Sequence, residues 1–283
     1  MTERVERIEE VRRRVGEARR KGLRIGLVPT MGALHEGHAS LLGRARAETG
    51  LVVVSLFVNP TQFGPGEDFR EYPRPREKDL EVCRREGADL VFTPTAAEMY
   101  PAGLATTVRV AGMSEKMCGA FRPGHFDGVC TVVAKLLGIV QPDAAYFGEK
   151  DAQQLAIVRR MAADLNLPVE IHGCPLVREA DGLALSSRNA YLSQAERRQA
   201  LEISRALAEA RRAILAGERD AARIGDGVRR RLAGAEGIGL DYVAVVDPDT
   251  LEDLERIGEK ALVAAAARVG KTRLIDNVLL RDL

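Results

Sequence analysis

The chain has 283 residues, of which 46% are hydrophobic and 29% charged, and its 42 basic and 41 acidic residues leave a net charge of +1. These proportions are ordinary for a folded protein and exclude a disordered chain. The balanced charge argues against DNA or RNA as a partner, because binding a phosphate backbone usually requires a basic excess. We therefore expect no nucleic-acid partner and a function that depends on local sites.

The sequence contains no pattern that predicts export or a membrane partner. The chain is charged from Glu3 onward, unlike a signal peptide, and it lacks an apolar run of about 18 residues that could span a bilayer. Its four cysteines show no C-x-x-C spacing, which favours buried, reduced thiols. We expect a cytoplasmic protein.

Strand-like and helical segments alternate over the first 184 residues. Apolar residues at helical spacing predict a first helix between Thr2 and Gly22. Further helices are predicted over about 36–48, 124–139 and 152–165, and another helix is predicted to end near Gly87. Strands are predicted over 23–28, 51–58, 90–92, 144–147 and 169–172. Such alternation predicts an α/β fold, with a Rossmann-like parallel sheet domain at residues 1–184 and helices on both faces of the sheet.

The pattern changes after this domain. Ser193 and Glu196 form a capping box that begins a long helix, which extends to about residue 216. A second helix follows, and then strand-like runs at 240–246, 261–269 and 272–276. Strands in direct succession favour an antiparallel sheet. We predict a smaller α+β domain at residues 185–283, which would act as a lid.

The most informative segment, residues 29–38 (PTMGALHEGH), lies where the first strand is followed by a helix. A helix N-terminus has free N–H groups and a partial positive charge, so it favours a polyphosphate. His35 and His38 share one face of the first turn, and Gly32 and Gly37 permit close approach of the backbone. We predict that both imidazoles donate hydrogen bonds to phosphate oxygens. The alternatives are a zinc pair, whose histidines are usually four apart, or a capping histidine beside a surface one.

Residues 146–151 (YFGEKD) also follow a predicted strand. Gly148 permits close approach of the backbone, and the Lys150 ammonium is a compact charge suited to a phosphate. Alone, this segment is typical of a surface turn. Its predicted position on the same sheet edge as residues 29–38 favours a binding role.

Residues 185–189 (LSSRN) bring two hydroxyl groups and a guanidinium together just before the second domain. Ser186, Ser187 and Arg188 could bind a pyrophosphate. A turn with helix-capping serines is an equally good interpretation.

Residues 59–64 (NPTQFG) follow the second strand. The amides of Asn59 and Gln62 could bind a small polar substrate. Asn-Pro turns are also common as plain structure, so this alternative stays open.

Taken together, these segments resemble the pantothenate synthetase family, the pantoate–β-alanine ligases of the cytidylyltransferase-like nucleotidyltransferase superfamily. The matching blocks are PTMGALHEGH (29–38), FVNPTQFGPGEDFREYPR (57–74), FRPGHFDGV (121–129), YFGEKDAQQ (146–154) and LSSRNAYLS (185–193). A His-x-Gly-His block alone is typical of the superfamily, whereas the NPTQF, GEKD-x-Q-Q and SSRN blocks are specific to this ligase family. The last ninety or so residues contain no motif that supports the resemblance.

The resemblance implies an AMP-forming ligase with ATP, pantoate and β-alanine as substrates. Pantoate would attack ATP to give pantoyl adenylate and pyrophosphate, and β-alanine would then displace AMP. The resemblance also implies a homodimer and Mg²⁺ that is bound mainly through the ATP phosphates. The sequence shows no dedicated carboxylate cage for a metal, so we predict no metal-ligating residues.

The resemblance also implies roles for individual residues. ATP would be bound by Met31, Gly32, Ala33, Leu34, His35, Glu36, Gly37, His38, Gly148, Glu149, Lys150, Asp151, Val177 (near the adenine), Leu185, Ser186, Ser187 and Arg188. The catalytic residues would be His38 as proton donor, His35 as its partner on the phosphate side, Lys150, Ser187 and Arg188. Gln62 and Gln154 would bind pantoate, Gln62 would also lie near β-alanine, and Asn59 would complete the substrate site.

Related tRNA synthetases have lysines in the loop that corresponds to SSRN, where this chain has only Arg188. We therefore expect Lys150 to supply a larger share of the positive charge.

Two other functions compete with this interpretation. A nucleotidyltransferase acting on a phosphorylated alcohol would share residues 29–38 but should lack the pair Gln62 and Gln154. A non-catalytic nucleotide sensor should have lost His35, His38 or Lys150. All five residues are present.

Overall fold

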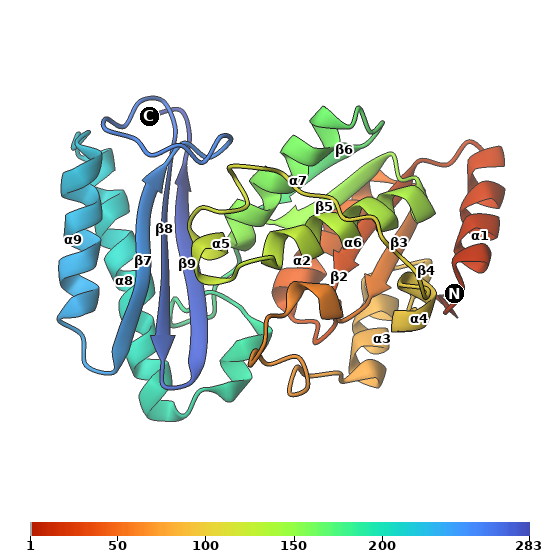
Figure 1. Cartoon of the computed structure of the whole chain (residues 1–283), viewed down its shortest axis with the longest axis horizontal. Coiled ribbons are helices and arrows are strands. Elements are labelled where there is room, and N and C mark those ends of the chain that lie inside the picture. Colours follow the sequence, from red (N-terminus) through yellow and green to blue (C-terminus); the bar gives the residue numbers. More distant parts are fainter. Residues whose placement is uncertain (1) are drawn as a thin grey trace. The chain divides into compact units, whose positions relative to one another are not determined.

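The computed structural model describes residues 2–283, which divide into two compact units (Figure 1). The first unit contains the chain up to Ser114 together with Arg122–Gly148 and Ile157–Cys174, and the second contains Glu115–Phe121, Glu149–Ala156 and Pro175–Leu283. The domain boundary at residue 184, with its lid, stays a prediction. Among the described residues, no helix is both long and apolar enough to cross a membrane.

The first unit is built on a parallel sheet, six-stranded within the described residues. Its strands are β1 (Glu3–Val5), β2 (Ile25–Thr30), β3 (Leu51–Leu56), β4 (Leu90–Phe92), β5 (Ala144–Gly148) and β6 (Glu170–Cys174). They lie in the order β1-β4-β3-β2-β5-β6, and every neighbouring pair is parallel. The predicted Rossmann-like α/β sheet is confirmed.

Helices cover both faces of this sheet. The longer ones are α1 (Ile8–Arg20), α2 (Glu36–Glu48), α3 (Arg76–Arg85), α6 (His125–Val140) and α7 (Ala152–Asp164), and the shorter ones are η1 (Pro60–Gln62) and α4 (Ala96–Met99). Val52 and Val53 of β3 are both fully buried although their side chains point to opposite faces. Leu42 of α2 and Leu80 of α3 pack against one face. The apolar run of β3 is therefore explained by burial on both sides.

The beginning of the chain differs from the prediction. Val5 is not in a helix but in β1, where it pairs with Phe92 of β4, and α1 begins only at Ile8. The spacing from Val5 to Ile8 fits a helical period, but pairing with β4 determines the conformation. A three-residue edge strand is too short to show its own periodicity.

The second unit contains an antiparallel sheet covered by two long helices. Its elements are α5 (Cys118–Phe121), η2 (Glu149–Asp151), η3 (Ser187–Tyr191), α8 (Gln194–Leu215), α9 (Ala221–Ala233), β7 (Ile238–Val246), β8 (Ala261–Val269) and β9 (Thr272–Leu280). The strands lie in the order β7-β8-β9. Ser193 Oγ accepts the Glu196 N–H and the Glu196 carboxylate accepts the Ser193 N–H, so the predicted capping box is confirmed.

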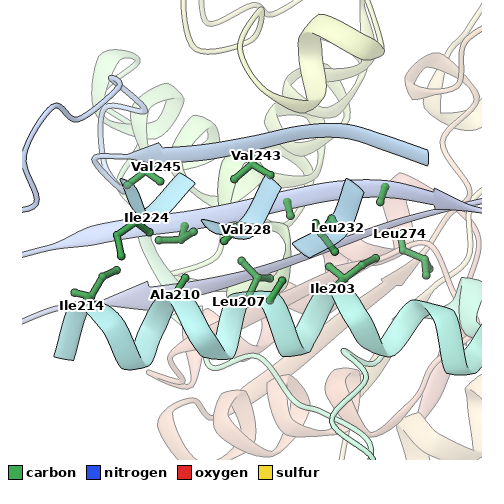
Figure 2. Close-up of a cluster of buried hydrophobic side chains, with 14 of the residues drawn as sticks. Ile203, Leu207, Ala210, Ile214, Ile224, Val228, Leu232, Val243, Val245 and Leu274 are labelled. Atoms are coloured by element: carbon green, nitrogen blue, oxygen red, sulfur yellow. The ribbon is translucent and has the colours of Figure 1, made fainter. Parts of the chain in front are cut away.

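The core of this unit lies between the two helices and the sheet (Figure 2). Buried apolar side chains project at helical spacing from α8 (Ile203, Leu207 and Ile214) and from α9 (Ile224, Val228 and Leu232). They pack against buried side chains of the strands, which include Val243 and Val245 of β7. This layer of helices on a sheet matches the predicted α+β arrangement. The strand β9, predicted to end at residue 276, continues to Leu280.

All four cysteines are buried, as predicted, and none forms a disulfide in the described part of the chain. Burial raises the pKa of the Cys83 and Cys130 thiols to about 12. Thiols protonated at neutral pH are poor nucleophiles, so these two cysteines serve packing.

Candidate active site

The strand order of the first unit brings the predicted motifs to one edge of the sheet. From β2 the chain moves through β3 to β4 on one side, whereas β5 pairs with β2 on the other side. The order therefore reverses between β2 and β5, and ligands of open α/β sheets bind at such a point, beyond the carboxyl ends of the strands. The segment 31–38 follows β2, Gly148 ends β5, and Asn59 lies just beyond β3.

The loop that follows β2 is held by Asp79 of α3. The Ala33 N–H donates to Asp79 Oδ2 at 2.9 Å, and the Leu34 N–H donates to Asp79 Oδ1 at 2.7 Å. Gly32 has φ +88°, and a Cβ there would lie 2.9 Å from Asp79 Oδ2, so both conformation and space require glycine. Burial raises the pKa of Asp79, although these two N–H groups oppose the shift. Asp79 was not predicted from the sequence, because nothing local to it indicates its distant partners.

His35 and His38 are oriented by backbone N–H groups at the start of α2. His35 is the N-cap, and its Nδ1 accepts the Gly37 N–H at 3.1 Å. The Nδ1 of His38 accepts the His35 N–H at 3.3 Å, and the two ring centroids lie 4.2 Å apart. Because each Nδ1 accepts a hydrogen bond, the proton of each neutral ring lies on Nε2. Both imidazoles are therefore arranged as Nε2–H donors.

This geometry bears on the alternatives for the two histidines. The interpretation of His35 as a capping residue is confirmed, and it is compatible with a second role through Nε2. In residues 2–283 no group of three or more His, Cys, Asp or Glu side chains could hold a metal ion. The donor set therefore gives no support to a zinc site at His35 and His38. The start of α2 at Glu36 agrees with the prediction.

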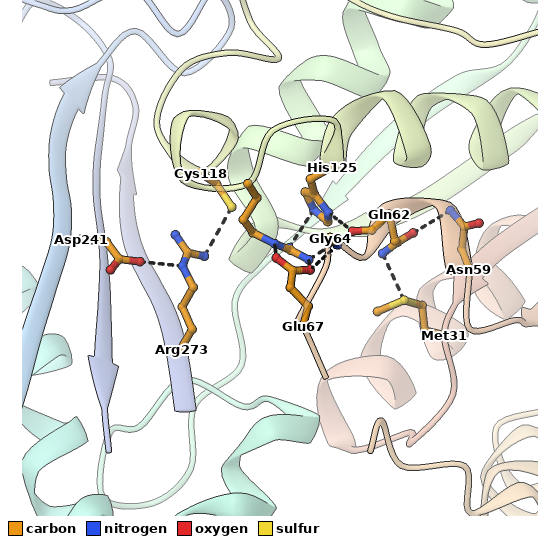
Figure 3. A network of polar contacts seen from close by, with 10 residues as sticks. Met31, Asn59, Gln62, Gly64, Glu67, Cys118, His125, Asp241 and Arg273 are labelled. Atoms are coloured by element: carbon orange, nitrogen blue, oxygen red, sulfur yellow. Dashed lines mark hydrogen bonds and ion pairs between the residues drawn. The ribbon is translucent and has the colours of Figure 1, made fainter. Parts of the chain in front are cut away.

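The carboxamide of Gln62 connects the loops that follow β2 and β3 (Figure 3). Its Oε1 accepts from Asn59 Nδ2 at 3.0 Å, and its Nε2 lies 3.1 Å from the Met31 sulfur. Gln62 and Asn59 are 8% and 1% exposed, which is unusual for amide side chains and indicates fixed positions. Met31 and Gln62, predicted to bind different substrates, are thus in contact.

Asn59 uses its whole carboxamide within the first unit. Its second Nδ2 hydrogen bond goes to the Gly128 carbonyl, and its Oδ1 accepts from Tyr100 Oη and from the Thr61 N–H and hydroxyl. The alternative of a structural Asn-Pro turn therefore describes these contacts of Asn59. The prediction that it binds substrate directly stays untested.

A charged network anchors the 59–67 loop to α6 and the residues just before it (Figure 3). Arg122 forms two hydrogen bonds with the Glu67 carboxylate, at 2.7 and 2.6 Å, and another with the Gln62 carbonyl. His125 Nδ1 lies 2.7 Å from the same carbonyl. Burial acts to raise the pKa of Glu67, but the hydrogen-bonded Arg122 guanidinium outweighs burial and holds this pKa below its ordinary value. The backbone that carries Gln62 is therefore fixed from two sides.

The remaining predicted residues belong to the second unit. Glu149, Lys150 and Asp151 form η2. Gln154 lies in the first turn of α7, which belongs to the second unit up to Ala156, whereas the rest of the helix belongs to the first unit. Val177 is half-buried, and its backbone carbonyl accepts the Leu185 N–H at 3.1 Å, which closes a hairpin before η3. Ser186 caps η3 by accepting the Arg188 N–H, as one alternative predicted, and Ser187 and Arg188 lie half-buried in η3.

Two relatives resemble this chain over nearly its whole length. The family model described as pantoate-beta-alanine ligase matches residues 3–279. A pantothenate synthetase of Moorella thermoacetica is 56% identical over 273 residues, which cover 96% of this chain and 96% of the relative. A pantothenate synthetase of Thermotoga neapolitana is 53% identical, covering 98% of this chain and 99% of the relative.

Solved structures extend the similarity to the fold. The crystal structure of pantothenate synthetase from Thermus thermophilus matches with a TM-score of 0.91 and 47% identity, covering 98% of this chain and 99% of that chain. A pantoate-beta-alanine ligase from Francisella tularensis, complexed with beta-gamma ATP and beta-alanine, matches with a TM-score of 0.79 and 32% identity, covering 99% of this chain and 98% of that chain.

Proposed function

Because the chain belongs to the pantoate–β-alanine ligase family, we propose that the loop between β2 and α2 binds ATP and that Gln62 binds pantoate. The enzyme condenses pantoate with β-alanine to give pantothenate, and it converts ATP to AMP and pyrophosphate through a pantoyl adenylate. One observation carries this function. His35 and His38 lie beyond the carboxyl end of β2, beside β5, where the sheet reverses its strand order.

In the first half-reaction, a carboxylate oxygen of pantoate attacks the α-phosphorus of ATP and pyrophosphate leaves. Negative charge develops on the phosphate oxygens as the new bond forms. We assign the Nε2–H groups of His38 and His35 to these oxygens, with His38 as the proton donor. The support is that both rings keep Nδ1 as an acceptor for a backbone N–H. Donors fixed in advance stabilise a charged transition state more than they stabilise the ground state.

In the second half-reaction, the amine nitrogen of β-alanine attacks the acyl carbon of pantoyl adenylate. The bond from that carbon to the phosphate oxygen breaks, AMP leaves, and the attacking amine loses a proton. We assign Gln62 to the pantoyl group in both halves, near the entering amine. Fixing the reacting groups in this way is itself a large part of catalysis. The hydrogen bond from Asn59 and the anchoring by Arg122 support a rigid Gln62.

We assign the remaining predicted residues to the nucleotide and to pantoate. Lys150, Ser187 and Arg188 would bind phosphate oxygens, with Lys150 supplying the larger share of charge. The other nucleotide contacts would come from residues 31–37, 148–151, 177 and 185–186, and Gln154 would join Gln62 at pantoate. Lys150 and Arg188 lie in the short helices η2 and η3, which restrict the backbone that carries their side chains.

Magnesium would enter as its complex with ATP. Mg²⁺ prefers oxygen ligands and usually keeps its contacts to substrate phosphates, so we propose that the triphosphate holds most of its coordination sphere. The donors that we infer near β2 are the imidazole Nε2–H groups of His35 and His38, which suit phosphate oxygens and fit a metal held by the nucleotide. We also propose a cytoplasmic homodimer, as in the family that the sequence resembles.

The products of ATP cleavage test this function directly. Purified enzyme with ATP and pantoate should release pyrophosphate in a single turnover, and AMP should follow when β-alanine is added. ATP with β-alanine alone should remain intact. Release of ADP and phosphate would contradict the proposal, because it would indicate an acyl-phosphate intermediate.

A further inference from the structure

Two neighbouring residues of β9, Asp276 and Asn277, hold two separate segments of the second unit. Each is only 5% exposed, although both side chains are polar. Successive side chains of a strand point to opposite faces, so the pair can reach different partners. One partner segment contains Lys150, and the other is the hairpin that leads into residues 185–188, so both bear on the residues that we assigned to phosphates.

Asn277 holds the turn that contains Lys150. Its Nδ2 donates to the Glu149 carbonyl and to the Lys150 carbonyl, both at 2.9 Å. A carboxamide nitrogen has two hydrogens, and here each is directed at one of two successive carbonyls. The side chain therefore fixes the direction of the η2 backbone from which the Lys150 side chain extends.

Asp276 holds the hairpin that leads to the Ser-Ser-Arg segment. Its two carboxylate oxygens accept from Arg178 Nη1 and Nη2 at 2.7 and 2.9 Å, a paired geometry that fixes orientation as well as distance. Arg178 also donates to the carbonyls of Gly182 and Asn277. A bridge from Arg178 to Ala184 closes the hairpin. The chain therefore enters residues 185–188 from a fixed point.

We propose that Asp276 and Asn277 are positioning residues for adenylate formation. Asn277 sets the position of Lys150, and Asp276 sets the position of residues 185–188. The inference rests on the proposed function, which assigns both segments to the phosphates of ATP. It gives a role to a part of the chain whose sequence contains no motif that supports the family resemblance.

The decisive variant is Asn277→Asp, which keeps the shape of the side chain but replaces both donor hydrogens with an acceptor oxygen. In single turnovers with ATP and pantoate, it should slow adenylate formation by up to ~10²-fold, the scale of a displacement of about 1 Å. The KM for ATP should rise as well. The reaction of β-alanine with synthetic pantoyl adenylate should change much less, because no triphosphate is bound in that step.

A double-mutant cycle separates positioning from general damage. If Asn277 acts through Lys150, then Asn277→Asp should lower the rate of adenylate formation by less than ~3-fold when Lys150→Ala is already present. Val278→Ala, on the same strand and packed against the core cluster, is the matched control for lost stability and should form adenylate normally. Asp276→Asn, tested against Arg188→Ala in the same way, examines the second segment. Melting temperatures are measured first, and Asn277→Ser replaces Asn277→Asp if the latter does not fold.

The outcomes distinguish the inference from the function on which it rests. The positioning role is wrong if Asn277→Asp slows adenylate formation no more than Val278→Ala does. It is also wrong if Asn277→Asp slows adenylate formation by the same factor with Lys150 present and with Lys150→Ala. In both cases the proposed function stands. If Lys150→Ala itself forms adenylate at the normal rate, the phosphate role assigned to Lys150 is wrong, and the inference is overturned with it.

Discussion

The backbone N–H of His35 donates a hydrogen bond to Nδ1 of His38, with 3.3 Å between the two nitrogens. This contact fixes the orientation of the second ring and leaves its proton on Nε2. It also divides the roles of one side chain between two atoms. Nδ1 stabilises the start of α2, and Nε2 is assigned to the phosphates.

These two roles can be separated by a pair of variants. In His38→Asn, the side-chain oxygen can still accept the His35 N–H in place of Nδ1, but the Nε2–H donor is lost. In His38→Ala, both the acceptor and the donor are lost. Both His38→Asn and His38→Ala should lower kcat by roughly 10²–10³, with a smaller change in ATP affinity, because both lose the donor used in the transition state. Only His38→Ala should also lower the melting temperature. Near-normal turnover in His38→Asn would show that the ring is only structural.

Lys150 should act in one half of the reaction. We expect its ammonium group to meet a phosphate oxygen that becomes more negative as pantoate attacks. Lys150→Ala should strongly impair adenylate formation and leave attack of β-alanine on synthetic pantoyl adenylate much less affected. Single-turnover assays started from ATP and from the adenylate measure the two steps. An equal loss in both, or none in either, would make residues 148–151 an ordinary turn.

Asp79 should support activity at a cost in stability. In Asp79→Asn the amide can accept from only one of the Ala33 and Leu34 N–H groups, so the loop that follows β2 should loosen. We expect a higher KM for ATP and a kcat lowered by ~10-fold or more. Steady-state kinetics with ATP as the varied substrate check this. An unchanged KM and kcat would show that the loop holds its shape without Asp79.

The stability of the same variant should depend on pH in a defined direction. Burial raises the pKa of Asp79 in the folded state above its ordinary value of 3.8, so the folded protein binds the proton more tightly than the unfolded chain does. The free energy of unfolding therefore falls as the pH rises from about 3.8 and Asp79 loses its proton. An asparagine does not titrate. Between about pH 3.8 and neutrality, the free energy of unfolding of Asp79→Asn should therefore rise relative to that of the unsubstituted protein. Urea unfolding at both ends of the range measures it, and a shift in the opposite direction would contradict the raised pKa.

Gly128 should be essential to the position of Gln62. A Cβ at Gly128 of α6 would lie 2.4 Å from the Thr61 carbonyl oxygen and 2.7 Å from the Gln62 nitrogen, and both are backbone atoms that must move as a loop. Gly128→Ala should raise the KM for pantoate far more than the KM for ATP. Gly138→Ala is the matched control, since a Cβ there meets nothing within 4 Å. Equal effects of the two substitutions on pantoate binding would contradict this role.

The sequence alone determined the elements that depend on local chemistry. The bounds of α2 and β4 agree with their predicted limits, and α8 begins at the predicted cap. Hydrophobic period, capping side chains and turn residues act over a few positions, so they can be identified along the chain. The segments resembling the ligase family were identified in the same way, and strand order then brought those after β2, β3 and β5 to one edge of a sheet.

Only the tertiary structure decided which residues hold these segments in place. Asp79 contacts Ala33, in the loop that follows β2, from 46 positions away, and Asn277 contacts Lys150 from 127 positions away. The burial of Asn59 and the pairing of Val5 with β4 depend on folded neighbours in the same way. A hydrogen bond between distant residues depends on distance and direction in space. These are set by packing of the whole unit, and no local pattern of residues records them.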